Sequence, residues 1–172
     1  MSDVILSLGA THVRRVPGET QLLLHGDPDD RGVLAACCGV DLTDVMLTSV
    51  RTASWSSLHL SPDEWLLVGP EGAGADMISR LGRAPVAHSL VDIPDRSVAL
   101  DLSGPGASDL LAGGCPLDLD AIADGGCTRT LFGKVTILLW RRGNDWRISH
   151  ARSFDNYVID LLRAIAADLV EV

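Results

Sequence analysis

The chain has 172 residues, of which 47% are hydrophobic and 22% are charged, a composition typical of a globular protein with one domain or two small halves. Its formal net charge is −9, so most of the surface would repel nucleic-acid phosphates, and we expect no nucleic-acid partner. No apolar run is long enough to cross a membrane and the N-terminus lacks a signal-peptide pattern, so we expect a cytoplasmic protein with no membrane partner.

The first half of the chain alternates between apolar strand patterns and helix patterns. Asp27 and Pro28 mark a helix start, because Asp accepts the free amide protons of the first turn and Pro fits the first helical position. Gly39 is a natural end for that helix. The pattern predicts strands at 20–26, 44–50, 57–60, 64–69 and 86–93, and a second helix at about 72–83.

The second half repeats this order of elements. It predicts strands at 97–104, 127–132, 134–141 and 145–151, a helix opened by Gly104 and Pro105, and a final helix at 153–168. In the final helix, apolar side chains recur at helical spacing, so we expect one face to pack on a sheet. These side chains are Phe154, Tyr157, Val158, Leu161, Ile165 and Leu169.

Residues of the two halves match in order. Pro28, Leu34, Ala35, Cys38 and Asp41 match Pro105, Leu111, Ala112, Cys115 and Asp118, each 77 positions later. Leu58, Trp65, Ile78 and Leu81 match Leu139, Trp146, Ile159 and Leu162, each 81 positions later. We therefore predict one domain, 1–172, made of two pseudo-repeats at about 20–93 and 97–168. The predicted fold is α+β, with duplicated strand–helix–strands–helix units and antiparallel sheets.

The stretch LSPDEWLLVGP (60–70) places Asp63 and Glu64 before Trp65. Two adjacent carboxylates could act as an acid/base pair, or could form the tip of a hairpin whose Trp turns inward. The second half has Asn144 and Asp145 before Trp146 at the equivalent place. This repetition favours the hairpin tip, because a turn needs polar residues and the next strand a large core side chain.

Few residues suggest catalysis. Ser103 has no G-x-S-x-G elbow around it, and the glycines that follow lack the spacing of a dinucleotide loop. The five histidines lie in no recognisable nucleophile motif. The remaining acid/base candidates are Asp92, Asp95 and Arg96, at the junction of the two halves. They could form a ligand edge, although a Pro-Asp turn is the interpretation that we favour.

The four cysteines show no metal-ligand spacing. Cys37 and Cys38 are adjacent, while Cys115 and Cys127 stand apart, and no histidine lies at a ligand distance from them. We interpret all four as small buried hydrophobes in a reducing compartment. No metal site is therefore expected.

Basic residues concentrate in one segment. Residues 129–152 hold six of the 14 basic residues and one of the 23 acidic ones. Thirteen of the basic residues are arginines, whose planar fork suits paired contacts with carboxylates in an interface or with an anionic ligand. A charge-balanced strand surface is the open alternative.

Four stretches together resemble a known family: LSPDEWLLVGP, DRSVALDLSGPGASDLLAGGCPLDLD, CTRTLFGKVTILLWRRG and ARSFDNYVIDLL. They resemble the gamma subunit of heterotetrameric sarcosine oxidase over about residues 55–164, whereas residues 1–19 add nothing that we can place. The resemblance implies a fold similar to the tetrahydrofolate-binding aminomethyltransferase domain of the glycine cleavage system. That domain is itself built from repeated α+β units.

The resemblance implies a supporting role. In this family the alpha and beta subunits hold FAD, FMN, NAD, the amine-oxidising site and the tetrahydrofolate-binding region, and the delta subunit holds zinc. The complex demethylates sarcosine to glycine and passes the one-carbon unit to tetrahydrofolate. We accordingly expect no catalytic residue, cofactor or metal in this chain. Its expected partners are mainly the alpha subunit, and the beta and delta subunits of the heterotetramer.

The basic strands suggest where this chain docks. We predict a partner interface at Trp140, Arg141, Arg142 and Arg147, because Trp and Arg dominate interface hot spots. Trp140 is expected to be exposed, since its counterpart in the first half, His59, is polar; a buried Trp140 among solvated arginines is the alternative.

Two other functions stay open. One is a stand-alone, folate-binding aminomethyltransferase-like protein, in which Asp92 or Asp95 would face the pterin or the bound amine. The other is a gamma-like subunit of an oxidase for a different N-methylated amino acid.

Overall fold

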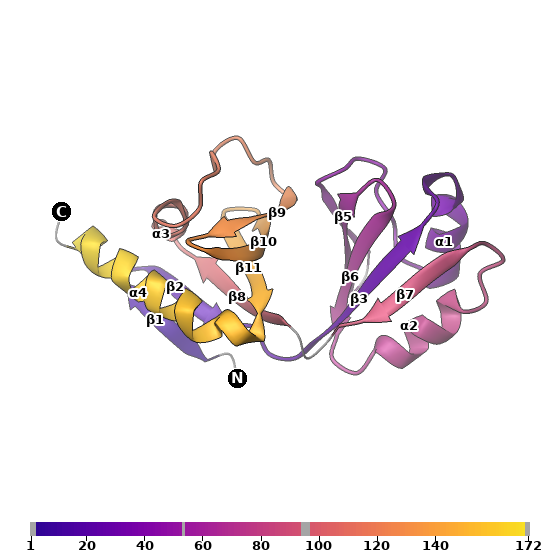
Figure 1. Ribbon diagram of the computed structural model, residues 1–172, viewed down its shortest axis with the longest axis horizontal. Helices are drawn as coiled ribbons and strands as arrows, with labels where there is room; N and C mark the ends of the chain where they lie inside the picture. Colours follow the sequence, from indigo (N-terminus) through magenta and orange to yellow (C-terminus); the bar gives the residue numbers. More distant parts are fainter. Residues whose placement is uncertain (1–2, 53, 94–96, 171–172) are drawn as a thin grey trace. The chain divides into compact units, whose positions relative to one another are not determined.

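The computed structural model describes residues 3–52, 54–93 and 97–170. It divides into two compact units (Figure 1). Unit 1 comprises Met1–Pro17 and Asp95–Val172, and unit 2 comprises Gly18–Pro94. None of the helices in these ranges is long and apolar enough to span a membrane.

Unit 2 is a five-stranded antiparallel sheet with two helices on one face. The strands are β3 (Glu19–Gly26), β4 (Ser49–Thr52), β5 (Trp55–Ser61), β6 (Glu64–Pro70) and β7 (His88–Asp92), in the order β4-β5-β6-β3-β7. The helices are α1 (Arg31–Cys38), which follows the 3₁₀ turn η1 (Pro28–Asp30), and α2 (Gly74–Leu81). Alternate residues such as Leu22 and Leu24 face these helices and form a core with Trp65, Leu34 and Met77.

Unit 1 is a six-stranded antiparallel sheet, also with two helices on one face. The strands are β1 (Val4–Leu8), β2 (Thr11–Arg15), β8 (Ser97–Ser103), β9 (Cys127–Phe132), β10 (Val135–Arg142) and β11 (Asp145–Ala151), in the order β1-β2-β8-β11-β10-β9. The helices are α3 (Ala107–Ala112) and α4 (Asp155–Val170), the latter preceded by the 3₁₀ turn η2 (Arg152–Phe154). Leu100, Leu102 and Ile148 pack against Leu110 and Leu162 in the core.

The two sheets share one strand order, which confirms the predicted α+β fold with duplicated antiparallel units. The series β4-β5-β6-β3 in unit 2 corresponds to β9-β10-β11-β8 in unit 1. The place beside β3 is taken by β7, whereas the equivalent place beside β8 is taken by β2 from the N-terminus. Residues 4–15, which sequence reasoning left unplaced, thus complete the sheet of unit 1.

Asp27, Gly39 and Gly104 have the local conformations that their residue types favour. The side chain of Asp27 accepts a hydrogen bond from the amide of Asp29 at 2.9 Å, and α1 ends at Gly39 with a left-handed φ of 67°. Gly104 has a φ of 98°, and a Cβ there would lie 2.3 Å from the carbonyl oxygen of Ala10. Only glycine fits where the end of β8 meets the β1–β2 turn.

Two local predictions need correction. The strand predicted at 44–50 begins only at Ser49, because the residues before it form a turn. Glu64 is the first residue of β6 rather than part of the hairpin tip, and it is buried opposite His25, with 3.1 Å between Oε2 and Nε2. Asp63 does lie exposed in the turn.

The packing face of α4 also differs from the prediction. Val158, Leu162, Ile165 and Ala166 are buried, whereas Phe154, Tyr157 and Leu169 are exposed. Phe154 lies in the 3₁₀ turn η2 and not in α4, so the helical spacing does not extend to it. The face that packs on the sheet is therefore rotated relative to the face that the apolar spacing suggested.

Candidate functional site

A row of polar side chains and one Trp crosses the sheet of unit 1. Arg14 on β2 pairs with Asp101 on β8, Asp101 pairs with Arg147 on β11, and Arg147 pairs with Trp140 on β10. Their neighbours along the strands, such as Leu102, belong to the core beneath α3 and α4. Because side chains alternate along a strand, these four lie on the face opposite the helices. We call Arg14, Asp101, Arg147 and Trp140 the arginine row.

Asp101 holds the centre of the arginine row. It accepts hydrogen bonds from Nε and Nη2 of Arg147 at 2.7 and 2.9 Å, a two-pronged contact that fits the planar guanidinium. Nη1 of Arg142 lies 3.5 Å from the same carboxylate. Arg147 is 6% exposed, so its buried positive charge needs the carboxylate of Asp101 as a partner.

Trp140 is 8% exposed, and the prediction of an exposed anchor is wrong. The guanidinium carbons of Arg142 and Arg147 lie 5.0 and 5.7 Å from its ring centre. Both cations therefore cover the ring in cation–π geometry. Trp140 supports the arginines and does not project from the surface.

A recess of ≈ 530 Å³ opens beside the arginine row. Arg14, Arg15, Arg142 and Arg147 line it together with Asp101, Asp145, Ser103, Val16, Pro17 and Trp146. Four cations therefore meet two carboxylates there, in a chain whose net charge is −9. Arg14 is exposed, and its side chain forms no hydrogen bond or ion pair with the described residues. The recess can accept a carboxylate or another anionic group.

Arg141 lies on the other face of the sheet, apart from the other predicted interface residues. Its guanidinium lies 5.3 Å from the ring centre of Trp146. Its Nη1 donates a 2.6 Å hydrogen bond to the carbonyl oxygen of Ile122. Arg141 thus fixes the loop between α3 and β9, and the structure brings together only Trp140, Arg142 and Arg147.

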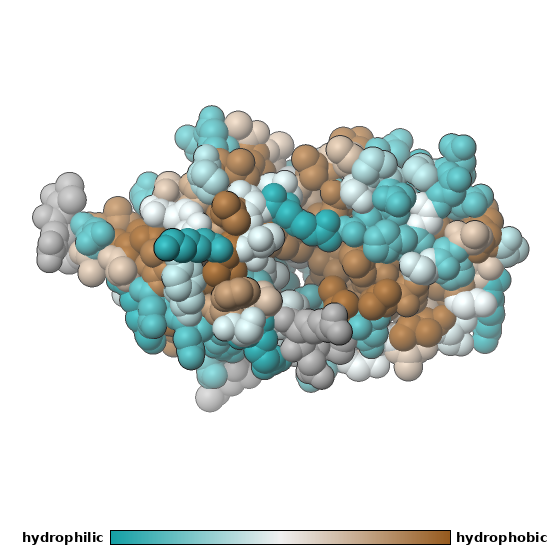
Figure 2. Space-filling view, viewed as in Figure 1, coloured by the Kyte–Doolittle hydropathy of each residue, from teal (hydrophilic) through white to brown (hydrophobic). Residues whose placement is uncertain are grey.

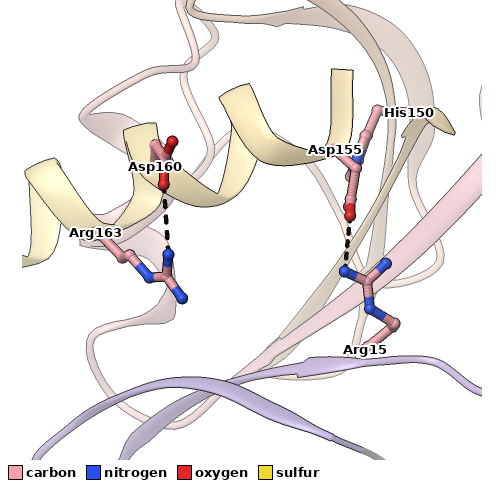
Figure 3. Close-up of polar contacts among 5 residues, drawn as sticks. All are labelled: Arg15, His150, Asp155, Asp160 and Arg163. Carbon is pink, nitrogen blue, oxygen red and sulfur yellow. Dashed lines mark hydrogen bonds and ion pairs between the residues drawn. The ribbon is translucent and has the colours of Figure 1, made fainter. Parts of the chain in front are cut away.

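A second polar cluster joins three elements of unit 1 (Figure 3). Asp155, at the start of α4, accepts a 2.7 Å hydrogen bond from Arg15 of β2. Its other oxygen lies 3.1 Å from Nε2 of His150 on β11. Burial disfavours the charged form of Asp155, but the hydrogen bonds from Arg15 and His150 outweigh burial and lower the pKa of Asp155.

Burial favours the neutral form of His150 in this cluster. Burial lowers the pKa of His150 and outweighs the opposite influence of Asp155. Its Nδ1 is buried and has no hydrogen-bond partner among the described residues. An unprotonated Nδ1 can tolerate this position better than a buried N–H donor without an acceptor. We therefore assign the proton to Nε2, which donates a hydrogen bond to Asp155.

Comparison with known proteins identifies the family. Residues 25–168 match the family described as sarcosine oxidase, gamma subunit family. The chain belongs to this family. A sarcosine oxidase subunit gamma from Arthrobacter sp. is 30% identical, over 94% of this chain and 85% of that protein.

One solved structure supports the same assignment. A chain of the heterotetrameric sarcosine oxidase from Corynebacterium sp. U-96, in complex with pyrrole 2-carboxylate, superimposes with a TM-score of 0.83. It is 29% identical, and the match covers 96% of this chain and 88% of that one. Aminomethyltransferase T of the glycine cleavage system from Bartonella henselae superimposes with a TM-score of 0.70, over 89% of this chain and 45% of that one. At 14% identity, this likeness shows the fold alone, which is aminomethyltransferase-like as the resemblance implied.

The catalytic candidates do not converge in this gamma-family chain. Ser103 lines the recess between arginines, and no histidine lines the recess with it. Asp92 is exposed on β7, an edge strand of unit 2, while Asp95 and Arg96 lie outside the described residues. Within the described ranges, no three His, Cys, Asp or Glu side chains could hold a metal ion together.

Sequence reasoning missed Arg14 and Asp101. The sequence did contain a hairpin pattern around Arg14, because VILSL and THVRR are separated by only Gly9 and Ala10. Asp101 was visible only as a polar residue in an apolar strand. Its role follows from its neighbours on β2 and β11, which are distant in sequence.

Proposed function

We propose that this chain is the non-catalytic gamma subunit of a heterotetrameric oxidase that demethylates sarcosine to glycine and passes the one-carbon unit to tetrahydrofolate. The observation that carries this proposal is the likeness, over 96% of the chain, to a chain of heterotetrameric sarcosine oxidase. The family match over residues 25–168 supports it independently of the fold.

In this proposal FAD, FMN, NAD, zinc and tetrahydrofolate are bound by the partner subunits, and this chain supplies shape and docking. The engagement of its own titratable groups supports this division. Asp101 is bound to Arg147, Asp155 to Arg15, and Glu64 to His25. These contacts join β8 to β11, α4 to β2, and β6 to β3, so each carboxylate holds two elements together.

The chain docks mainly on the alpha subunit, with the beta and delta subunits completing the complex in the cytoplasm. The recess beside the arginine row is the proposed contact. Arg14 and Arg142 line this recess. Arg142 packs on the ring of Trp140, and Asp101 binds Arg147, so the cationic lining is held in place by fixed contacts. A preformed cationic recess suits an acidic side chain or segment of the alpha subunit, since little ordering is needed on binding.

Charge reversal tests this docking surface. Arg14→Glu and Arg142→Glu are co-expressed with the alpha, beta and delta chains of the host, and the dissociation constant of each complex is measured. Each variant should weaken the complex about tenfold, since a rim charge contributes on the order of 1.4 kcal/mol. Arg163→Glu is the matched control and should leave the affinity unchanged, because Arg163 lies on the exposed face of α4, 3.4 Å from Asp160 (Figure 3).

Equal affinity for all three variants would remove the recess from the docking surface. Failure of the wild-type chain to join the oxidase chains at all would refute the proposed function itself. The two outcomes are distinct, because the first still yields a complex.

A further inference from the structure

Three consecutive apolar side chains project from unit 2. Val45, Met46 and Leu47, in the turn before β4, are 59%, 48% and 41% exposed. Single exposed hydrophobic residues are common, and Figure 2 shows hydrophobic residues scattered among hydrophilic ones on the visible face. A tight turn made of three such residues is different, because turns ordinarily take Gly, Pro, Asn, Asp or Ser. We call these three residues the apolar tip.

Side-chain hydrogen bonds hold the apolar tip in one conformation. The hydroxyl of Thr43 accepts from the amide of Val45 at 3.1 Å, and the hydroxyl of Thr48 donates to the carbonyl of Val45 at 2.6 Å. The amide of Leu47 donates to the carbonyl of His59 on β5 at 2.8 Å. Leu47 is thereby tied to β5, and Val45 to the threonines on either side of the tip, so the tip is preorganised.

The base of the tip is anchored in the core of unit 2. The carbonyl of Thr43 accepts a 3.1 Å hydrogen bond from the indole N–H of Trp65. The ring of His59 stacks on Trp65 with 4.7 Å between ring centres. The segment before the tip is therefore hydrogen-bonded directly to Trp65, the most buried aromatic side chain of this unit.

The backbone of the tip is strained. Leu47 has a φ of 61°, and it is the one non-glycine with a positive φ among the described residues. A bulky residue is unfavourable at a positive φ, which glycine adopts without a steric penalty. Strain that the surrounding structure enforces is found preferentially at functional sites. The strained position presents a leucine side chain to solvent, so a function of that side chain is indicated.

We propose that the apolar tip is a docking knob that inserts into an apolar pocket, rimmed by Lys or Arg, on another subunit of the oxidase. Asp41 and Asp44 precede the tip in the chain and are exposed, so a basic rim would complement them. The carboxylate of Asp44 lies 3.7 Å from Nη2 of Arg31 and stays 74% exposed. The rigid tip loses little conformational freedom on binding. This inference rests on the proposed function and adds a second contact, in unit 2, to the arginine recess in unit 1.

Two substitutions separate docking from folding. Leu47→Gly removes the side chain and also relieves the positive φ, so the melting temperature of the chain should stay the same or rise. Met46→Ser removes the neighbouring side chain and leaves the Thr43 and Thr48 hydrogen bonds in place. Ile78→Ser is the matched control, because Ile78 is 43% exposed on α2 of the same unit.

The dissociation constant of each variant for the alpha–beta–delta assembly is measured by calorimetry, and the isolated chains are examined by sedimentation velocity. Leu47→Gly and Met46→Ser should each weaken binding about tenfold, the effect of burying one such side chain, and Ile78→Ser less than about twofold. Unchanged affinity in both tip variants, with the wild-type complex intact, overturns the knob but not the proposed function. If the isolated wild-type chain forms a dimer and Met46→Ser dissociates that dimer, the tip is a contact between two copies of this chain. This result would also overturn the docking knob.

Discussion

Asp101→Asn perturbs the contact on which the arginine row depends. The carboxylate accepts two hydrogen bonds from Arg147 and lies 3.5 Å from Arg142. A hydrogen bond to a charged group contributes about 1.5–3 kcal/mol. Because the side chain of Asp101 is 36% exposed, solvent screening places each bond at the lower end, and we expect a loss of about 3 kcal/mol in the free energy of unfolding.

Urea unfolding followed by circular dichroism measures this loss, and a double-mutant cycle assigns it. Arg147→Gln combined with Asp101→Asn should cost less than the two single changes together, with a coupling of about 1–2 kcal/mol. Asp145→Asn is the control, because this exposed carboxylate accepts a long hydrogen bond, at 3.4 Å, from the amide of Gly104. Additive single effects, or an equal loss in the control, would refute the central role of Asp101.

Three further predictions concern unit 1. Asp155→Asn should cost about 2 kcal/mol in urea unfolding, because it weakens the contacts with Arg15 and His150. Burial lowers the pKa of His150 in the folded chain. Below about pH 6.5 the unfolded chain therefore binds a proton at His150 that the folded chain does not bind. Stability should consequently fall as the pH drops from 6.5 to 5, and less steeply in His150→Gln; parallel pH profiles would contradict this. Arg141→Ala should speed amide hydrogen exchange around Ile122, whose carbonyl Arg141 holds, while unchanged protection would show that the loop is held by other contacts.

The strands were predictable where alternation and turns agree. The strand predicted at 127–132 coincides with β9, and the one at 145–151 coincides with β11. In β11, Trp146, Ile148 and His150 are buried on the face that the helices cover, whereas β9 contributes only Phe132 to the core. A glycine-containing turn borders each strand. The duplication was visible for the same reason, since each half repeats the same local pattern.

The burial of Trp140 was not predictable from the repeat, because a β-bulge changes the register. β5 has an irregularity between His59 and Ser61, whereas β10 pairs with β11 without one. The ladder places His59 opposite Trp65 and Arg141 opposite Trp146. His59 therefore corresponds to Arg141, and each covers the Trp across from it. One inserted residue moved the equivalence by one position, which turns a side chain to the other face.

The candidate docking site was only partly predictable because it depends on strand order. Arg142 and Arg147 were found from the local concentration of charge. Arg14 joins them through β2, which pairs with β8 across 87 positions of sequence at Arg14 and Asp101. The strain at Leu47 is a backbone property that composition does not reveal.

The most direct test of the account is purification of this chain from its native host, followed by absorbance spectroscopy before and after its partners are dissociated. We predict that larger oxidase chains travel with it, that flavin absorbance accompanies the assembly, and that the chain recovered alone is colourless. A stoichiometric flavin, folate or metal retained by the isolated chain would contradict the claim that it docks and supports while its partners perform the oxidation.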